Sequence, residues 1–278
     1  MSTREESGEV SLDTSAGKAG EVALRRAAEG RDVSRVWDAE RLANPHRQPD
    51  KSSRVRRMFD EIAPTYERVN TVCSAGRDAR WRRTAVALAR VAATDAVLDV
   101  ACGTGDLARA FAQARGGAAR PIVGCDFSRN MLERARRSSA ARFHWCQADA
   151  QRLPFADNSF QVIGCAFGVR NFQALDVGLA EMYRVAAPGG RVVILEFTRP
   201  RRRLIRTLYE FYTTRLMPLG AALLSGDRSG AYRYLPRSVV SFLDAEQMTA
   251  RLRAAGFVKV EYRPLTFGAV TVYLAIKG

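Results

Sequence analysis

The chain contains 278 residues, of which 47% are hydrophobic, and it carries a formal net charge of +15. This length allows one large domain or two small ones, and the composition is that of a globular protein with a full core. No apolar run approaches the roughly 18 residues that a membrane-spanning helix needs, and the first residues lack the apolar stretch of a secretory signal. The sequence therefore predicts a cytoplasmic globular protein.

Nearly all the basic residues are arginines, and lysine occurs at only four positions. A basic protein can attract nucleic acid, an anionic membrane surface or an acidic substrate. Because the arginines are scattered rather than gathered in one stripe, a general preference for arginine is the simpler interpretation. Five widely spaced cysteines without a C-x-x-C pair indicate neither a disulfide framework nor a structural zinc site, so we expect no metal site.

The chain divides into two parts by composition. Residues 1–53 are rich in Ser, Glu, Gly, Ala and Arg, and we expect a mostly disordered tail with a short helical patch. Residues 54–278 are predicted to form one folded domain. It begins with segments 54–70 and 78–92, whose apolar residues recur at helical spacing, and these helices are expected to cap a pocket.

Five apolar runs then alternate with helical segments, and they cover residues 96–101, 121–126, 141–149, 159–167 and 189–197. This alternation predicts βαβ units and a parallel sheet. The last segment, residues 257–278, contains two strands too close together for a crossover helix, so they should form an antiparallel hairpin. The predicted fold is α/β and Rossmann-like: a doubly wound, mostly parallel seven-stranded sheet with a C-terminal antiparallel hairpin and N-terminal cap helices.

In an open parallel sheet, ligands bind beyond the carboxyl ends of the strands. The first apolar run ends in a glycine-rich turn, where Gly103 and Gly105 allow the backbone to turn tightly and approach a ligand closely. Asp99 lies inside the same run, where a carboxylate needs partners such as loop N–H groups or a nearby cationic ligand. These three residues are therefore candidates for cofactor binding.

The next two strand ends also carry carboxylates. Asp126 follows Gly105 by 21 residues, a spacing that suits the two hydroxyls of an adenosine ribose. The alternative is a helix N-cap, for which Ser128 is also a candidate. Asp149 can accept a hydrogen bond from an adenine amino group while Ala150 offers an N–H, and the alternative for Asp149 is an ordinary Asx-turn.

Four ordered motifs resemble those of class I S-adenosylmethionine-dependent methyltransferases: VLDVACGTGDLA, GCDFSRNML, ADAQRLPFADNSF and EMYRVAAPGGRVVILEF. Three others resemble the menaquinone/ubiquinone biosynthesis C-methyltransferases: FGVRNF, SGAYRYLPRSVVSF and GAVTVYLAIKG. The resemblance implies that S-adenosylmethionine is the cofactor and that Thr104, Asp126, Asp149 and Ala150 contact it. It also implies methylation of a ring carbon of a polyprenylated quinol, either demethylmenaquinol or the ubiquinol precursor.

The polar end of the fourth run is the candidate acceptor site. Arg170 could stabilise a phenolate form of the acceptor, and Asn171 could orient the ring oxygens. Tyr66 and Asp78, from the cap helices, are further catalytic candidates, with Asp78 as a base. The alternative for Arg170 is a salt bridge that holds the cap closed. The chain departs from the family pattern at Asp78, where His is common, and at Ala166, where Ser is frequent.

Residues 199–226 combine a basic cluster with an apolar, aromatic stretch, which suits a peripheral helix at an anionic bilayer. The alternative is a cap helix packed on the domain. We expect the quinol as partner, peripheral contact with the inner face of the membrane and no nucleic acid; a homo-oligomer is compatible with the sequence.

Other functions stay open. A nicotinamide dehydrogenase would share the glycine turn, and a class I methyltransferase could act on another small molecule or on RNA. A non-catalytic lipid-binding subunit is the non-enzyme alternative.

Overall fold

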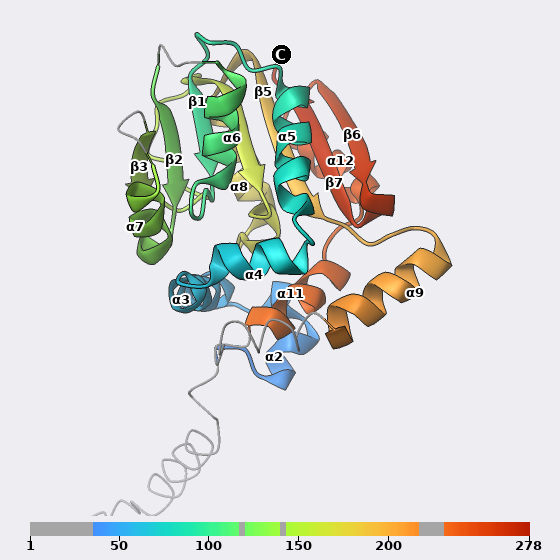
Figure 1. The fold of residues 1–278 in the computed structure, drawn as a ribbon. Helices are drawn as coiled ribbons and strands as arrows, with labels where there is room; N and C mark the ends of the chain where they lie inside the picture. The colour runs from blue at the N-terminus through green and yellow to red at the C-terminus, as the bar shows by residue number, and fades with distance from the viewer. Residues whose placement is uncertain (1–35, 117–119, 140–142, 217–230) are drawn as a thin grey trace, which may run out of the picture. The chain divides into compact units, whose positions relative to one another are not determined.

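A seven-stranded sheet forms the centre of the computed structural model, which describes residues 36–116, 120–139, 143–216 and 231–278 (Figure 1). The strands are β1 (Val97–Val100), β2 (Ile122–Asp126), β3 (Phe143–Gln147), β4 (Phe160–Ala166), β5 (Ala186–Phe197), β6 (Lys259–Leu265) and β7 (Val270–Ile276). Their order is β3-β2-β1-β4-β5-β7-β6. The first five strands are parallel, whereas β7 is antiparallel to both β5 and β6. The predicted fold class and hairpin are confirmed, and the first five strands differ from the predicted runs by at most three residues at either end.

Ten helices surround the sheet in the described residues: α2 (Ala39–Ala43), α3 (Lys51–Ile62), α4 (Tyr66–Cys73), α5 (Arg77–Ala89), α6 (Asp106–Ala114), α7 (Arg129–Arg137), α8 (Leu175–Val185), α9 (Arg203–Phe211), α11 (Ala231–Val240) and α12 (Ala245–Ala254). Short helical turns connect some of them: η1 (Pro45–Arg47), η2 (Val169–Asn171), η3 (Tyr212–Leu216) and η4 (Thr266–Gly268).

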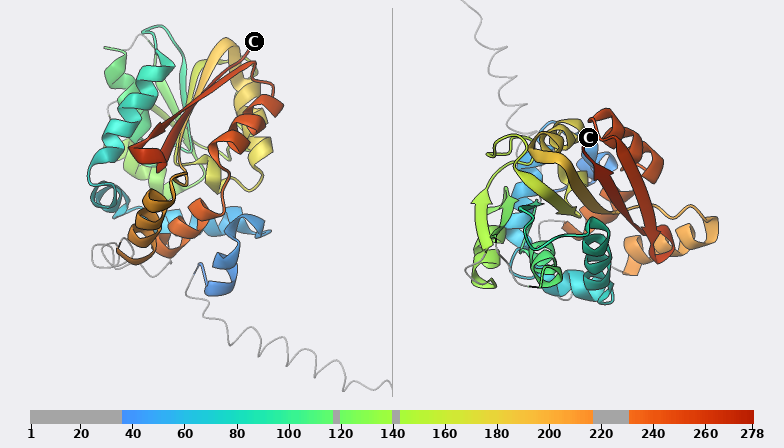
Figure 2. Two further views of the ribbon diagram at one scale, coloured as in Figure 1. Left: turned by 90° about the vertical axis from the view of Figure 1, so that its right-hand side faces the viewer. Right: turned by 90° about the horizontal axis from the view of Figure 1, so that it is seen from above.

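Helices cover both faces of the sheet. Apolar residues of α5 and α6 pack against one face, and those of α8 and α12 pack against the other. Figure 2 shows these two layers with the sheet between them. All four residues of β1 are buried, which explains why its sequence reads as a continuous apolar run rather than an alternating one.

A third layer, the cap, lies beyond the carboxyl ends of the parallel strands. It contains α3, α4 and α11, which Figure 1 shows beneath the sheet. The cap has its own apolar cluster, which includes Trp37, Met58 and Tyr234. The predicted cap helices therefore form, and they are joined by α11 from the distant C-terminal third of the chain.

The predicted tail, residues 1–53, lies partly outside the described residues, which begin at Val36. From that point the chain packs on the cap, with Val36, Trp37 and Leu42 buried. We therefore propose that the folded domain begins near Val36 rather than at Arg54.

Candidate active site

Two pockets lie beyond the strand ends. The strand-end pocket has about 610 Å³ of space and is lined mainly by the turns that follow β1, β2, β3 and β4. The cap cavity is larger, about 1540 Å³, and lies among α3, α4, α5, η3 and α11. Three aromatic side chains, Phe59, Tyr66 and Phe167, line both pockets. A ligand in one pocket can therefore approach a ligand in the other at this shared wall.

The glycine turn connects β1 to α6 and forms one side of the strand-end pocket. Gly103 and Gly105 both have positive φ, +54° and +88°, a conformation that side chains disfavour. A Cβ atom on Gly105 would lie 2.5 Å from the ring of Trp145, so glycine is required there for space as well. Thr104 is buried, and its hydroxyl has no hydrogen-bond partner among the described residues.

Asp126 lies at the floor of the strand-end pocket. Its two oxygens accept hydrogen bonds from the backbone N–H groups of Gly103 and Ser128, both at 2.8 Å. Ser128, not Asp126, caps α7, because its hydroxyl accepts from the N–H of Met131. Burial raises the pKa of Asp126 to about 6. The carboxylate is thus ionised at neutral pH, and each oxygen keeps capacity to accept another hydrogen bond.

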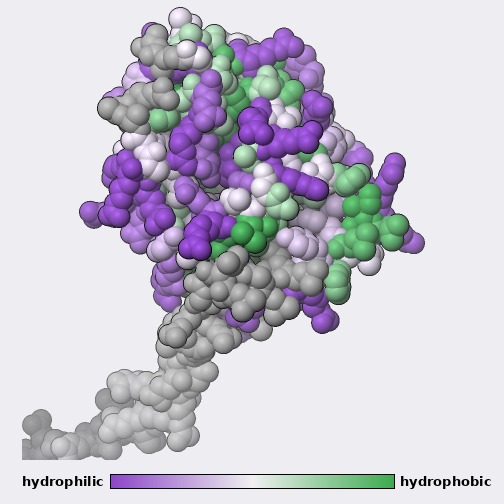
Figure 3. Space-filling model, in the orientation of Figure 1, coloured by the Kyte–Doolittle hydropathy of each residue, from purple (hydrophilic) through white to green (hydrophobic). Residues whose placement is uncertain are grey.

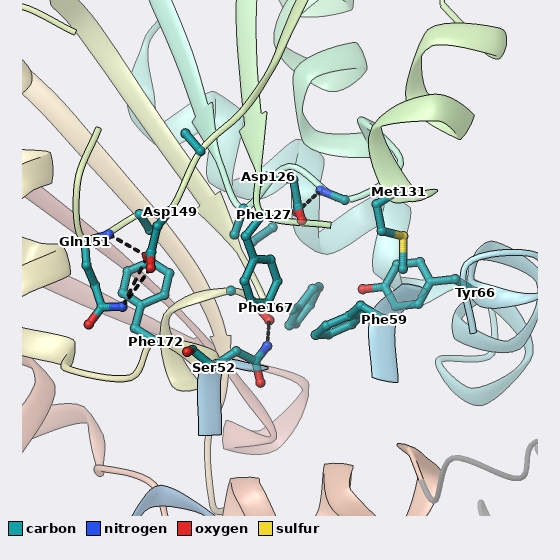
Figure 4. Close-up of a pocket in the computed structure, with 17 residues that line it drawn as sticks. Ser52, Phe59, Tyr66, Asp126, Phe127, Met131, Asp149, Gln151, Phe167 and Phe172 are labelled. Atoms are coloured by element: carbon teal, nitrogen blue, oxygen red, sulfur yellow. Dashed lines mark hydrogen bonds between the residues drawn. The ribbon is translucent and has the colours of Figure 1, made fainter. Parts of the chain in front are cut away.

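Asp149 and Ala150 form another part of the same pocket. Asp149 Oδ1 accepts hydrogen bonds from the backbone N–H and the side-chain amide of Gln151, at 2.9 and 3.1 Å. The Asx-turn that the sequence left as an alternative is therefore present, and it also places Asp149 on the pocket wall. Figure 4 shows Asp149 and Gln151 at one end of the pocket and Tyr66 with Met131 at the other.

These features fit S-adenosylmethionine. A carboxylate with free acceptor capacity suits the ribose hydroxyls, and the aromatic and apolar walls suit the adenine ring. The unpartnered hydroxyl of Thr104 is a further polar group beside the turn. Of the expected cofactor residues, the wall of the pocket as described contains Gly103, Asp126, Asp149 and Ala150.

Asp99, Thr104 and Gly105 are outside that wall. Asp99 is completely buried, and its Oδ2 accepts a hydrogen bond from the N–H of Ala108 at 2.9 Å. Its other oxygen has no partner among the described residues, and burial raises its pKa to about 8. We propose that Asp99 holds the first turn of α6 against β1 and acts on the cofactor only through that turn.

Arg170 lines the cap cavity but is buried and paired. Its guanidinium contacts Glu196 Oε1 and the Phe167 carbonyl, each at 2.7 Å, and lies 5.4 Å from the ring centre of Phe197. Glu196 also accepts from the backbone N–H groups of Arg170 and Phe197, at 3.3 and 2.8 Å. A salt bridge, which the sequence left as the alternative for Arg170, is thus present, although its partner lies on β5 and not in the cap.

Asn171 lines the strand-end pocket rather than the cap cavity, although it follows Arg170 directly in sequence. Its side chain lies on the wall of the strand-end pocket, and its amide donates to the Phe167 carbonyl at 3.2 Å. Its Oδ1 accepts from the hydroxyl of Tyr234 at 2.9 Å. The turn η2 therefore directs its Arg into the cap cavity and its Asn toward the strand-end pocket.

Asp78 is also on the wall of the cap cavity, but it is engaged by a cation. Its carboxylate lies 2.6 Å from the guanidinium of Arg82 and accepts from the Ser74 hydroxyl at 2.9 Å. Burial opposes ionisation, yet these hydrogen bonds lower the pKa of Asp78. Arg82 in turn reaches Asp106 at 3.2 Å. We propose that Asp78 orients Arg82, since a carboxylate with a lowered pKa is a weak base.

Tyr66 lies at the shared wall of the two pockets, and burial raises the pKa of its phenol. Sequence reasoning missed two charged residues here, Glu196 and Arg82. Glu196 carried a usable signal, because it is an acid within the apolar run VVILEF, as Asp99 is within VLDVA. Arg82 also carried a signal, because it follows Asp78 by four residues on a predicted helix, the spacing at which opposite charges pair.

Known proteins are similar to this chain over most of its length. The sequence profile of the ubiE/COQ5 methyltransferase family matches residues 47–277. The chain is 46% identical to the demethylmenaquinone methyltransferase of Thermus thermophilus over 78% of this chain and 98% of the relative. It is 43% identical to the ubiquinone/menaquinone biosynthesis C-methyltransferase UbiE of Geotalea daltonii, over 82% of this chain and 98% of the relative.

Solved structures share the fold at low identity. One is an S-adenosylmethionine-dependent methyltransferase from Thermotoga maritima, described as a possible histamine N-methyltransferase. It superposes with a TM-score of 0.56 and 18% identity over 80% of this chain and 99% of that chain. A methyltransferase in complex with the Haloferax volcanii Trm112 activator superposes with a TM-score of 0.55 and 17% identity. The match covers 78% of this chain and 96% of that chain. At such identities these structures support the fold alone.

Proposed function

The chain belongs to the ubiE/COQ5 methyltransferase family, and we propose that it methylates a ring carbon of a polyprenylated quinol with S-adenosylmethionine as methyl donor. Demethylmenaquinol and the corresponding ubiquinol precursor are the proposed acceptors. When bound, the cofactor supplies an electrophilic methyl group on a positively charged sulfur.

The shared wall of the two pockets carries this proposal. Phe59, Tyr66 and Phe167 border both the strand-end pocket and the cap cavity, so two ligands can meet there out of bulk water. The cap cavity is lined mostly by apolar and aromatic side chains, which suit a flat ring with a hydrocarbon substituent. Alignment of donor and acceptor accounts for much of the acceleration expected for such a transfer.

In this proposal Gly103, Asp126, Asp149 and Ala150 hold the nucleoside part of the cofactor. Arg170 presents the positive end of its ion pair with Glu196 to the cap cavity, which favours the ionised form of an acceptor hydroxyl and so makes the adjacent ring carbon more nucleophilic. Glu196 keeps the guanidinium in one position through its hydrogen bonds.

The activity is tested with purified protein, methyl-labelled S-adenosylmethionine and short-chain quinols. We expect demethylmenaquinol or the ubiquinol precursor to receive one labelled methyl group in place of a ring hydrogen, which leaves as a proton, and we expect no binding of a nicotinamide dinucleotide. Labelling of RNA without labelling of either quinol would contradict the proposal.

The role of Arg170 is tested without leaving a buried charge unpaired. The double variant Arg170→Met with Glu196→Gln removes both charges together, because breaking only one side of a buried pair is strongly destabilising. We expect kcat to fall by about 100-fold or more while cofactor affinity stays near wild type. Turnover close to wild type in this variant would show that the pair is structural.

We also propose that α9 brings the protein to the surface of an anionic membrane, where a polyprenylated quinol resides. Leu204, Leu208 and Phe211 lie on one face of α9 at helical spacing, and they are 74%, 61% and 57% exposed. Figure 3 shows an apolar patch at the position of α9 in Figure 1. On the same helix, Arg203 and Arg206 make no ion pair with any described residue, so their charges are available to lipid phosphates.

The next residues connect this helix to the proposed substrate site. Tyr209, on α9, and Tyr212 and Thr213, on η3, line the cap cavity. The same segment thus has an exposed apolar face and a cavity-lining face, which gives a hydrocarbon substituent a short route between cavity and membrane. No helix among the described residues is long and apolar enough to cross a membrane.

Vesicle sedimentation tests this contact. We expect binding to vesicles with anionic lipid at low salt, and a loss on the order of tenfold when Leu204, Leu208 and Phe211 are all replaced by Ser. Val177→Ser on α8 is the matched control, because Val177 is exposed on a different face. Equal binding by the triple variant and the control would refute the role of α9.

A further inference from the structure

A tyrosine of the cap holds the amide of Asn171. Tyr234, on α11, is buried, and its hydroxyl donates to Asn171 Oδ1 at 2.9 Å. The other end of the same amide donates to the Phe167 carbonyl at 3.2 Å. Burial raises the pKa of the Tyr234 phenol, so the hydroxyl keeps its proton and remains a donor at all physiological pH values. The Asn171 amide is therefore fixed in one orientation by contacts at both ends.

A tryptophan from the N-terminal segment fixes the tyrosine in turn. The ring of Trp37 is fully buried and stacks on the ring of Tyr234, with 4.5 Å between ring centres and an interplanar angle of 29°. The backbone on either side of this contact is anchored: Arg54 donates to the Val36 carbonyl at 2.9 Å, and Arg233 donates to the Trp37 carbonyl at 3.3 Å.

This chain of contacts joins the two pockets. Asn171 lines the strand-end pocket, whereas Tyr234 lines the cap cavity, so the hydrogen bond between them runs from one pocket wall to the other. Trp37 supports it from outside the region matched by the family profile, which begins at residue 47. A segment outside the matched region is thus packed one residue away from the cap cavity, through Tyr234, and two residues away from the strand-end pocket, through Tyr234 and Asn171.

We propose that Trp37 and Tyr234 are positioning residues of the methyl-transfer site: the stacked Trp37 holds the Tyr234 hydroxyl on Asn171, and this contact keeps the strand-end pocket and the cap cavity in register. The proposal rests on the proposed function, in which donor and acceptor occupy these two pockets. Small errors in such alignment reduce the rate of transfer much more than they reduce binding. The N-terminal segment from Val36 is therefore part of the working site and not only of the scaffold.

The test is a double-mutant cycle read in kcat, KM and cofactor affinity. Tyr234→Phe removes the hydroxyl and keeps the ring, and we expect kcat to fall by about 10- to 100-fold with a nearly unchanged dissociation constant for S-adenosylhomocysteine. Trp37→Leu should lower kcat to a similar extent, because it removes the stacking partner. The kcat of the double variant should be at most about threefold lower than that of the slower single variant, because both changes break the same chain of contacts.

A conservative rescue separates positioning from folding. Trp37→Phe retains an aromatic ring, and the indole N–H it removes has no partner among the described residues, so we expect kcat within about threefold of wild type. The control pair is Tyr183 and Phe257, whose ring centres lie 5.1 Å apart. These rings belong to the core between the sheet and helices α8 and α12, away from the cap. Phe257→Leu should lower the melting temperature, and neither Phe257→Leu nor Tyr183→Phe should lower kcat at temperatures where the variants are folded.

The outcomes distinguish the two proposals. If wild type methylates a quinol but Tyr234→Phe keeps wild-type kcat, the positioning proposal is wrong and the function stands. Multiplicative losses in the Trp37 and Tyr234 double variant would equally overturn it, because they would show independent effects. If wild type binds S-adenosylhomocysteine but methylates neither quinol, the proposed function is the one that fails.

Discussion

Asp126 and Asp99 are both buried acids at the end of a parallel strand, but their surroundings give them different roles. Asp126 lies on the pocket wall with two backbone N–H donors, and burial raises its pKa only to about 6. Asp99 has one such donor and one oxygen without a partner among the described residues, and burial raises its pKa to about 8. At neutral pH the first is a carboxylate ready to accept hydroxyl donors, whereas the second is mostly protonated.

Cofactor affinity should therefore depend on pH through Asp126. Below a pH of about 6 the carboxyl is protonated and accepts ribose hydroxyls less well, so the dissociation constant for S-adenosylhomocysteine should rise by up to about tenfold per pH unit. Titration calorimetry between pH 5 and 8 measures this. Asp126→Asn should bind weakly at every pH in the range, and an affinity of the wild type that stays constant from pH 5 to 8 would contradict the assignment.

Asp99 should make folding stability fall as pH rises. Its pKa is raised in the folded state, so between pH 5 and 7 the native protein keeps a proton that the unfolded chain releases, and native stability decreases with pH. Asp99→Asn mimics the protonated form and removes this slope. We expect the stability of Asp99→Asn relative to wild type to increase by about 1 kcal/mol per pH unit in denaturant unfolding between pH 5 and 7. A constant difference would mean that Asp99 is ionised in the fold.

At the scale of elements, the β1–α6 turn depends on a residue of β3. Trp145 lies beneath the turn, and a Cβ atom on either Gly105 or Gly124 would come within 2.5 Å of its ring. An asparagine could adopt the positive φ of Gly105, but the contact with Trp145 leaves no room for any side chain there. The strand pairing of β2 with β3 therefore helps to fix the shape of the turn that borders the strand-end pocket.

Two glycines with positive φ separate the effects of strain and space. Gly116→Ala introduces strain only, because no atom of the described residues lies within 4 Å of its Cβ position, and should cost about 1 kcal/mol of unfolding free energy. Gly105→Ala introduces the same strain and displaces the Trp145 ring. It should destabilise the protein by about 1 to 3 kcal/mol more and weaken cofactor binding, as measured by denaturant unfolding and calorimetry. Comparable losses in both variants would show that the ring moves aside easily.

At the scale of the whole molecule, a net charge of +15 favours approach to any anionic surface. The exposed apolar face of α9 adds a contact that acts only at close range. Long-range attraction and short-range insertion should therefore respond differently to salt, since the screening length falls from about 30 Å at 0.01 M to about 3 Å at 1 M.

Membrane binding should accordingly weaken as salt rises but not vanish. We expect vesicle binding by wild type to decrease steeply between about 50 and 500 mM salt and to level off at a residual value due to α9. The triple Ser variant of α9 should lose that residual part. The same residual binding by both proteins at high salt would place the apolar contact elsewhere on the surface.

Much of this architecture follows from local sequence patterns. Apolar runs and glycine turns repeat along the chain, and the carboxyl ends of parallel strands meet at one edge, so Gly103, Asp126 and Asp149 could be placed around one pocket without coordinates. The hairpin followed from the short distance between its two strands. For Asp99 the sequence left the orientation open, because a carboxylate beside a loop can face either a ligand or the adjacent helix, and the structure shows it bonded to α6.

The sequence by itself determined the fold class, the family and the edge of the sheet where the strand-end pocket lies, because these depend on periodicity and on the order of motifs. Tertiary structure alone decided which distant partners the polar groups find: Glu196 for Arg170, and Tyr234, itself stacked on Trp37, for Asn171. Tyr234 lies 63 positions from Asn171 in the sequence, and Trp37 lies 197 positions from Tyr234. Such pairings depend on how helices from both ends of the chain close over the sheet, and no local pattern encodes that geometry.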